Sequence, residues 1–479
     1  MRKAIEQIRH RWRGRRTTRS SVAAEDPNSP LLAQPKQGQL PNPSSPQPDQ
    51  VVPTLREITR KYLGLPRLTV WGAFGGLIVL IGLVASLIDL GDYLQRPEGR
   101  MTGDFRVAIA AFEVAGPREN RPMGEDLAHG VYLRMEEELE ELSPDFVTTI
   151  WSPEQVGTVR GATQEKRAES AARTAVDIEA DIVVYGLVDT SQPVWTVTPE
   201  FYISDQNLTD AQEITGQHEI GEPLEAVGQG SVATRIEVST QMSTRAQLIS
   251  VITVGLAYYA ALDYPRAQTV FEQLERDFDW SEVGGEEVLY LLLGNAAGKN
   301  DALDTAERAY RRALAENPDY SRAYAGLGST YYIRALEPVE ASGNGVDIDH
   351  ELLNQSIDFY HQAAAAAVHP ALSDIPAKVH FGLGQAYLAL HLQNGNEPVA
   401  RAIEEFDAVI GEYDTGDNPR IRHLAAEAHA RLGLIHDLNG NRDAAVDEYE
   451  AAVSLLDDVP DRRRLYEDRL RELRDEVPG

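Results

Sequence analysis

The sequence contains no cysteine, and this absence excludes several kinds of site. A chain without thiols forms no disulfide, thiolate zinc site, iron–sulfur cluster or cysteine nucleophile. The sequence also lacks a phosphate-binding glycine loop, a G-x-S-x-G elbow and histidines at metal-ligand spacing. We therefore expect no cofactor and no metal, and the chain is predicted not to be an enzyme. The compartment stays open, because a cysteine-free protein is tolerated on either side of a membrane.

Positive charge is scarce and unevenly distributed, with 45 Lys and Arg against 75 Asp and Glu. Residues 1–67 hold 13 of the basic residues and only 5 of the acidic ones, so this arm has a net charge of +8. The rest of the chain has a net charge of −38, which argues against nucleic-acid binding there. Such a change in the sign of the net charge indicates that a structural boundary separates the two parts of the chain.

An apolar segment of 21 residues without a charge, LTVWGAFGGLIVLIGLVASLI, follows the basic arm. At about 1.5 Å per residue it spans the roughly 30 Å hydrocarbon core, which predicts a transmembrane helix over 68–90. A buried helix rarely runs this long without a polar face, and a cleaved signal peptide would need an unusually long charged region. Basic residues precede the segment and acidic ones follow it. The positive-inside rule therefore predicts a single-pass cell-membrane protein with a cytoplasmic amino terminus and extracytoplasmic carboxy-terminal domains.

The helix and the arm before it carry further signals. Gly72 and Gly76 form a GxxxG motif that allows close helix–helix contact and a possible homodimer, although glycine is common in membrane helices. The arm over 1–67 combines the basic stretch MRKAIEQIRHRWRGRR with a Pro- and Ser-rich segment, and is predicted to be largely disordered. The basic stretch favours anionic lipid headgroups, whereas RNA binding has no stacking platform or folded motif to support it.

After a linker over 91–103, the pattern over 104–225 predicts a small α/β domain. Strands are expected at 105–114, 147–151, 181–190, 194–204 and 214–221, and helices at 124–142 and 163–180. Strands and helices that alternate and then end in a hairpin indicate a compact sheet covered by helices. His129 and His218 have no catalytic partners in the pattern, and Asp181 is expected to be a turn or cap residue at the entry of a strand.

These residues resemble the amino-terminal domain of TolB and the TolB-like domains of bacteria. The resemblance rests on an apolar strand ending at Phe112, on GEDLA at 124–128 and on ADIVVYGLV at 180–188. The hairpin departs from that family, because SDQNLTDAQEITG replaces the usual Asp-x-x-Thr-Gly turn. The resemblance implies a bacterial origin and names no ligand.

Beyond a second linker over 226–245, residues 246–460 are alanine-rich and repeat a helical pattern at a 34-residue period. Each repeat places a glycine in its first helix and an aromatic residue in its second. These residues are Gly255 and Phe271, Gly294 and Tyr310, Gly328 and Tyr360, Gly384 and Phe406, and Gly433 and Tyr449. Two repeats need insertions, near 337–350 and around 394–398. The stretch resembles the tetratricopeptide (TPR) family, which implies a superhelical solenoid of about five helix pairs, and 461–479 is predicted to be a charged capping helix.

In TPR solenoids the first helices line a concave groove, so the resemblance implies a set of binding residues. The set is Asn295, Lys299, Arg322, Ser329, Tyr332, Lys378, Gln385 and Arg431. An asparagine backed by bases from neighbouring repeats can bind an acidic side chain or a C-terminal carboxylate, which predicts a protein or peptide partner. The alternative is that these bases only pair with acids on adjacent helices.

A metal site is suggested by a group of four histidines: His380, His391, His429 and His436. His380 and His429 fall at repeat position 4, and His436 at position 11, where the pattern takes a large ring. They are therefore predicted to be packing residues rather than ligands. Asp347 and Asp349 resemble part of a calcium loop but lack its glycine and terminal glutamate, which favours a solvated loop.

The expected fold class is α+β overall and mostly α, with one transmembrane helix, a small α/β TolB-like domain and a TPR solenoid. The favoured hypothesis is a non-catalytic membrane-anchored adaptor that binds a protein or peptide through the groove on the extracytoplasmic side. The alternative is a ligand sensor that works with a separate signalling partner, although the cytoplasmic arm has no folded output domain. An envelope hydrolase would need an acid/base or nucleophile set that we find in no segment.

Overall fold

The computed structural model describes residues 99–475, apart from 143–145, 209–210, 228–230, 343–347, 367–373, 395–398, 417–418 and 458. The predicted arm over 1–67, the predicted transmembrane helix over 68–90 and most of the first linker lie outside the described residues. Among the residues that are described, no helix is both long and apolar enough to cross a membrane.

The first part of the described chain is a mixed sheet of seven strands. The strands are β1 (Phe105–Ile109), β2 (Glu113–Ala115), β3 (Thr148–Trp151), β4 (Ile182–Asp189), β5 (Val194–Ile203), β6 (Gly216–Glu219) and β7 (Leu224–Val227). Their order is β3-β1-β4-β5-β6, with β2 paired to β4 and β7 paired to β5. The strands β1, β2, β3 and β4 pair in parallel, whereas β5 runs antiparallel to β4, β6 and β7. The expected strand over 105–114 is thus two strands, β1 and β2, joined by a break.

Helices cover both faces of this sheet because alternate residues of its strands are apolar. Val107 and Val184 face α4 (Arg121–Leu142) and α7 (Val232–Ala260), within one apolar cluster. Ala108 and Val183 face the opposite way, against α6 (Gln164–Ile178). The short elements η1 (Arg118–Asn120) and α5 (Pro153–Val156) complete this part. Side chains that alternate along a strand explain the two separate apolar layers.

The prediction of a linker over 226–245 is wrong. Residues 224–227 form the edge strand β7, and the single helix α7 then runs from Val232 to Ala260. The amino-terminal half of α7 packs beside α4, where the Gln247 amide donates to the Glu138 carboxylate at 3.1 Å. Its carboxy-terminal half is the first helix of the first repeat. The helix that packs beside α4 and the first helix of the solenoid are therefore one continuous helix.

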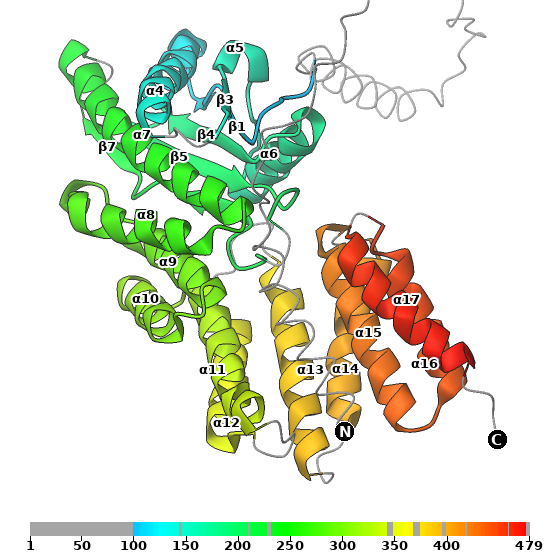
Figure 1. The fold of residues 1–479 in the computed structure, drawn as a ribbon. Coiled ribbons are helices and arrows are strands. Elements are labelled where there is room, and N and C mark those ends of the chain that lie inside the picture. The colour runs from blue at the N-terminus through cyan, green and yellow to red at the C-terminus, as the bar shows by residue number, and fades with distance from the viewer. Residues whose placement is uncertain are drawn as a thin grey trace, which may run out of the picture. The chain divides into compact units, whose positions relative to one another are not determined.

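The rest of the chain is a solenoid of paired helices (Figure 1). After α7 the elements are α8 (Tyr264–Asp277), η2 (Trp280–Glu282), α9 (Glu286–Lys299), α10 (Leu303–Glu316), α11 (Ser321–Ser342), α12 (His350–Ala365), α13 (Ile375–Asn394), α14 (Val399–Asp414), η3 (Pro419–Ile421), α15 (Arg422–Leu438), α16 (Arg442–Ser454) and α17 (Pro460–Asp475). The repeats are α7/α8, α9/α10, α11/α12, α13/α14 and α15/α16. The last helix, α17, packs against α16 where a capping helix was expected.

In each repeat the two helices pack together where the glycine of the first helix meets the aromatic ring of the second, at the positions that the sequence pattern predicts. A methyl group built on Gly294 would lie 2.5 Å from the Tyr310 ring, and one on Gly255 would lie 2.4 Å from the Phe271 ring. Gly328, Gly384 and Gly433 face the rings of Tyr360, Phe406 and Tyr449 in the same way. The two helices approach this closely only where one of them has no side chain. The TPR-type solenoid predicted from the 34-residue pattern is therefore present.

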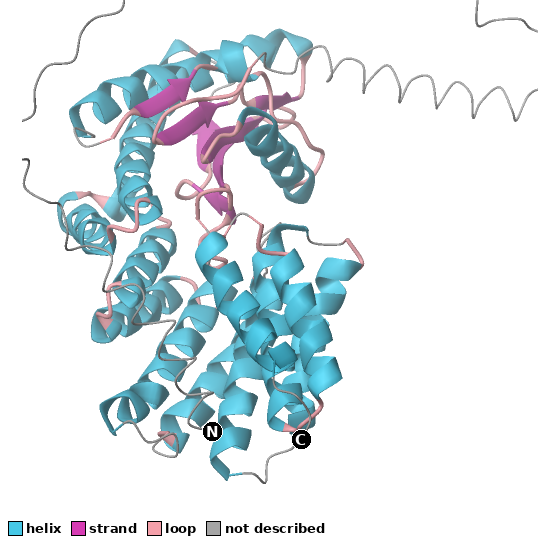
Figure 2. Cartoon of the chain, turned by 45° about the vertical axis from the view of Figure 1, so that its right-hand side comes forward, coloured by secondary structure: helices cyan, strands magenta, loops and turns pink. Residues whose placement is uncertain are grey.

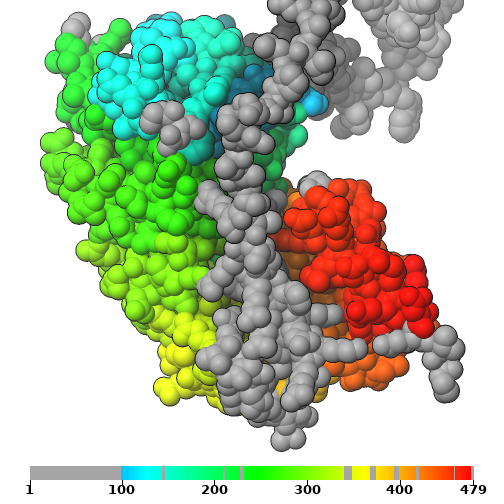
Figure 3. All heavy atoms as spheres, viewed as in Figure 1, coloured from blue at the N-terminus to red at the C-terminus, as the bar shows by residue number. Residues whose placement is uncertain are grey.

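The sheet and the first three repeats share one hydrophobic core. A single apolar cluster extends from Phe105 on β1 through Ile249 on α7 to Tyr331 on α11. In the space-filling view the atoms of α4, in cyan, and of α7 to α9, in green, form one continuous surface (Figure 3). A second cluster joins α11 to α15, and a third joins α15 and α16 to α17. Residues 99–475 thus belong to one folded unit in which the sheet contacts the solenoid directly.

Candidate functional site

Some of the residues predicted to line the solenoid groove meet a segment of the same chain. This segment is the β5–β6 loop, residues 204–215, of which 209–210 are not described. Figure 2 shows loops, in pink, leading from the magenta strands toward the helices of the solenoid. Leu208, Ala211 and Ile214 of the β5–β6 loop are buried in the cluster that the sheet shares with the solenoid. Residues 211 and 213–215 of the loop, together with Leu208, are therefore part of the interior, whereas Gln206 and Asn207 are exposed.

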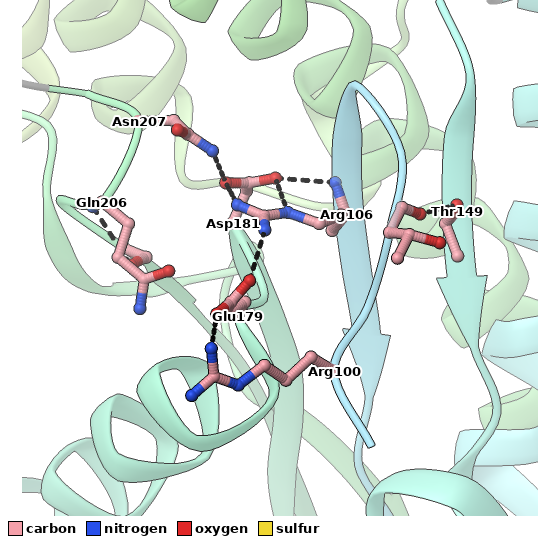
Figure 4. A network of polar contacts seen from close by, with 9 residues as sticks. Arg100, Arg106, Thr149, Glu179, Asp181, Gln206 and Asn207 are labelled. Atoms are coloured by element: carbon pink, nitrogen blue, oxygen red, sulfur yellow. Dashed lines mark hydrogen bonds and ion pairs between the residues drawn. The ribbon is translucent and has the colours of Figure 1, made fainter.

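The β5–β6 loop is held at its root by Asp181 (Figure 4). The Asp181 carboxylate accepts hydrogen bonds from the main-chain N–H and the guanidinium of Arg106, at 2.7 and 3.0 Å. The Asn207 amide donates to the same carboxylate at 2.6 Å, and the Ser204 N–H donates to the Asp181 carbonyl at 2.9 Å. Asp181 was expected to be a turn or cap residue. Its observed role is to fix β1, β4 and the start of the β5–β6 loop in one place.

Arg322, on the first helix of the third repeat, binds the main chain of the β5–β6 hairpin. Its guanidinium donates to the Glu213 carbonyl at 2.7 Å and to the Gln217 carbonyl at 3.2 Å, and lies 3.0 Å from Nε2 of His218. The Arg322 side chain has no exposed surface. Burial lowers the pKa of Arg322, and the nearby Tyr320, Asp374 and Glu213 oppose that shift. A groove residue predicted to bind a partner thus forms an internal contact between the solenoid and the sheet.

Two more predicted groove bases act on the carboxylate of Glu213. Nζ of Lys378, on α13, lies 3.2 Å from Oε1 of Glu213, whose side chain is 6% exposed. Burial raises the pKa of Glu213, but Lys378, a backbone hydrogen bond and Lys299 outweigh it, so the pKa lies below its ordinary value. Lys299, at the end of α9, therefore contributes electrostatically from the neighbouring repeat. Bases from two repeats and Arg322 from a third thus converge on one glutamate.

The other predicted groove residues contact the solenoid itself. The hydroxyl groups of Ser329 and Tyr360 are 3.0 Å apart, and Tyr332 packs against the same cluster of the third and fourth repeats. Asn295 is buried on α9, and its Nδ2 has no hydrogen-bond partner among the described residues. Gln385 on α13 and Arg431 on α15 are half-buried farther along the chain. Of the predicted set, Arg322 and Lys378 thus contact the β5–β6 loop directly, and Lys299 acts on Glu213 through its charge.

A buried ion pair of the later repeats acts on the sheet through its charges. Asp374, just before α13, pairs with the Arg420 guanidinium at 2.8 Å, and both side chains are largely buried. Charges of this pair act on Tyr202 of β5 and on Asp205 at the start of the β5–β6 loop. Burial, followed by the charge of Asp374, raises the pKa of the Asp205 carboxyl. Charged residues of α9, α11, α13 and η3 thus all act on the hairpin.

Two of the four histidines considered as metal ligands each pair with one carboxylate. Nδ1 of His380 lies 2.7 Å from Glu405, and Nδ1 of His429 lies 2.7 Å from Glu448. No group of three His, Cys, Asp or Glu side chains suited to a metal occurs among the described residues. Asp349 accepts hydrogen bonds from the N–H groups at the start of α12 and is therefore a helix cap.

Sequence reasoning missed the β5–β6 loop as a binding segment. The signal that could have found it was the departure from the TolB-like turn, where SDQNLTDAQEITG extends the hairpin by apolar and acidic residues. Residues 207–210 and 211–215 look solvated in sequence, since Asn, Thr, Asp and Gln are typical of turns. Only the structure reveals that Glu213 and Ile214 are buried, with Ile214 in the apolar cluster that the sheet shares with the solenoid.

Acid is expected to weaken the contact between the hairpin and the solenoid through His218. Burial and the adjacent Arg322 hold the pKa of His218 well below 6.5. The folded protein therefore keeps His218 neutral, whereas the unfolded chain takes up a proton as the pH falls below about 6.5. From pH 8 to pH 5 this difference lowers the free energy of unfolding by about 2 kcal/mol.

The measurement is urea unfolding of the wild type and of H218Q at pH 8 and at pH 5. We expect the loss of unfolding free energy between pH 8 and pH 5 to be about 2 kcal/mol smaller in H218Q than in the wild type. Glu213 does not obscure this comparison. Its pKa is lowered in the folded protein, so the stability that its ionised form contributes is lost only below about pH 4.5. Equal pH dependence in the two proteins would contradict the assignment of a neutral buried His218.

Comparisons with known proteins place the chain in no family. No family model matches it, and no curated protein matches it. Among solved structures, a TPR protein from Thermus thermophilus is 21% identical over 46% of this chain and 98% of that chain, with a TM-score of 0.33. The C-terminal part of a TPR repeat-containing protein from Cytophaga hutchinsonii is 15% identical over 49% of this chain and 93% of that one, with a TM-score of 0.22. These TM-scores are low. The assignment of five repeats depends instead on the glycine–aromatic contacts within this chain.

Proposed function

We propose that the chain is a non-catalytic, membrane-anchored adaptor that recruits a protein partner through its solenoid. The observation that carries the proposal is the contact between first helices of the solenoid and the β5–β6 loop. Arg322 and Lys378 hold an acidic segment of polypeptide there, through its main-chain carbonyls and through a glutamate side chain. Groups that bind such a segment within the chain have the chemistry to bind one from a partner.

The anchor in this proposal is the apolar segment over 68–90, with a cytoplasmic arm and the sheet and solenoid on the outer side. The 21 uncharged residues and the change of sign across them support this topology. Anionic lipid headgroups would attract the basic arm, and Gly72 with Gly76 would allow a homodimer. The TolB-like motifs around Phe112 and over 180–188 support a bacterial cell envelope as the setting.

The test is crosslinking on spheroplasts or protoplasts with a membrane-impermeant reagent, followed by purification of the full-length chain. We expect the reagent to reach the chain without lysis and to capture one reproducible partner. The variant R431E reverses a half-buried charge on α15, and we expect it to capture at least about tenfold less partner if that face binds.

The matched control is R308E, because Arg308 is exposed on α10, a second helix of its repeat. Capture should be unchanged in R308E. Labelling only after lysis would contradict the topology, and the absence of a reproducible partner on either side of the membrane would contradict the adaptor role.

A further inference from the structure

We propose that the β5–β6 loop is an intramolecular ligand of the partner-binding groove. The external partner would then present a segment of the same chemistry, with a glutamate directly before a β-branched apolar residue. This inference rests on the proposed adaptor function and adds the identity of the partner segment. It also makes the groove a closed site that a partner must open.

The acidic half of this chemistry is the Glu213 carboxylate. Its Oε1 lies 3.2 Å from Nζ of Lys378 on α13, and Lys299 on α9 adds a second positive charge. The Glu213 side chain is buried, and a buried carboxylate is costly unless cations compensate it. The groove therefore selects for a negative charge at this position and disfavours a neutral or basic side chain.

The apolar half is Ile214, which has no exposed surface and lies in the cluster that includes Leu291 and Tyr320 of the solenoid. Ala211 and Leu208 lie in the same cluster, two and five residues before Glu213. Burying a side chain of this size contributes about 1.5–3 kcal/mol. The groove thus requires an apolar residue beside the charge.

The main-chain contacts of Arg322 do not depend on side chains. Its guanidinium donates to the carbonyl group of Glu213, which any polypeptide offers, and to that of Gln217 on β6, which stays in the sheet. Arg322 therefore binds the main chain of a segment whatever its sequence. Lys378 and Lys299 add specificity, because they favour a carboxylate at one position. A segment from another protein can satisfy both.

The β5–β6 loop has the advantage over an external segment because it is tethered. Asp181 fixes the loop at its root through Ser204 and Asn207. A tethered segment acts at an effective concentration in the millimolar range or above, so an external peptide with equal contacts does not displace it at micromolar concentration. Removing the loop from the groove should raise the affinity for such a peptide without any new contact.

The experiment measures binding of a fluorescent peptide, LTDAQEITG, which copies residues 208–216, to the full-length chain in detergent. In the variant E213R an arginine faces Lys378 and Lys299, and like-charge repulsion expels the loop. We expect E213R to bind the peptide at least about tenfold more tightly than the wild type, as followed by fluorescence anisotropy. The additional change K378E should abolish that gain.

The control peptide is LTDAQQITG, in which the copied glutamate is glutamine. It should bind the E213R chain at least about tenfold more weakly than the acidic peptide. Equal binding of the two peptides, or no gain in a variant with wild-type circular dichroism, would overturn the inference. If E213R fails to fold, E213A replaces it, and failure of both to fold would also overturn the inference, because the loop would then be an obligatory part of the core.

The outcome is separable from that of the proposed function. Tight peptide binding with no partner crosslinked in cells would show that the loop and a peptide of its sequence compete for one site, and would refute the adaptor role. A partner captured equally by the wild type, E213R and K378E would support the adaptor role and refute the inference, because the binding surface would lie elsewhere.

Discussion

The variant R322M is expected to lower the free energy of unfolding by about 3–5 kcal/mol. The guanidinium of Arg322 is fully buried and donates to the carbonyl groups of Glu213 and Gln217. Methionine keeps much of the volume of the side chain but has no donor. Both carbonyl groups would then be left inside the protein without these partners, and His218 would lose its contact as well.

Urea unfolding followed by circular dichroism measures this effect, with R431M as the matched control. Arg431 is a predicted groove residue of the same type, but it is only half-buried on α15. We expect R431M to lie within about 1 kcal/mol of the wild type, as is usual for substitutions near the surface. Equal stability of R322M and the wild type would mean that the hairpin is not held by Arg322.

The variant G382A is expected to lower the free energy of unfolding by about 3 kcal/mol, at the upper end of overpacking effects. A Cβ atom on Gly382 would lie 2.1 Å from Cζ of Tyr360. The Tyr360 ring has no room to retreat, because Gly328 approaches it on another side and Ser329 lies 3.0 Å from its hydroxyl oxygen. The substitution must therefore separate the third repeat from the fourth.

The control is G411A, which makes the same chemical change in the next helix. A Cβ atom on Gly411 has no neighbour within 4 Å, and the residue lies inside α14. Alanine is a better helix former than glycine, so G411A should raise the stability by about 0.5–1 kcal/mol. Opposite signs in the two variants are the expected result, and a loss of stability in both would contradict the packing argument.

The repeats could be predicted from the sequence because their determinants are local. A glycine in one helix and a ring in the next, such as Gly294 and Tyr310, meet across a single turn of the chain. The spacing in sequence therefore fixes the contact in space. The positions of Lys299, Arg322 and Lys378 on first helices follow from the same period.

The occupant of the groove could not be predicted in this way. Glu213 lies 109 residues before Arg322 and 165 before Lys378, and no period relates a hairpin to a solenoid. The continuous helix α7 was missed for a related reason. The polar segment before residue 246 resembles a linker, and its helix is stabilised by packing on the sheet rather than by its own sequence.

The helix α7 also has a mechanical consequence. With 29 residues at about 1.5 Å each, it is a rod roughly 43 Å long. It packs on the sheet at one end and forms part of the first repeat at the other. A rotation of the sheet would turn the first pair of helices by the same angle, and each later pair would follow through its neighbour. A pull applied near the start of β1 would therefore reach the solenoid as torque, through α7 and through the apolar cluster that the sheet shares with the first three repeats.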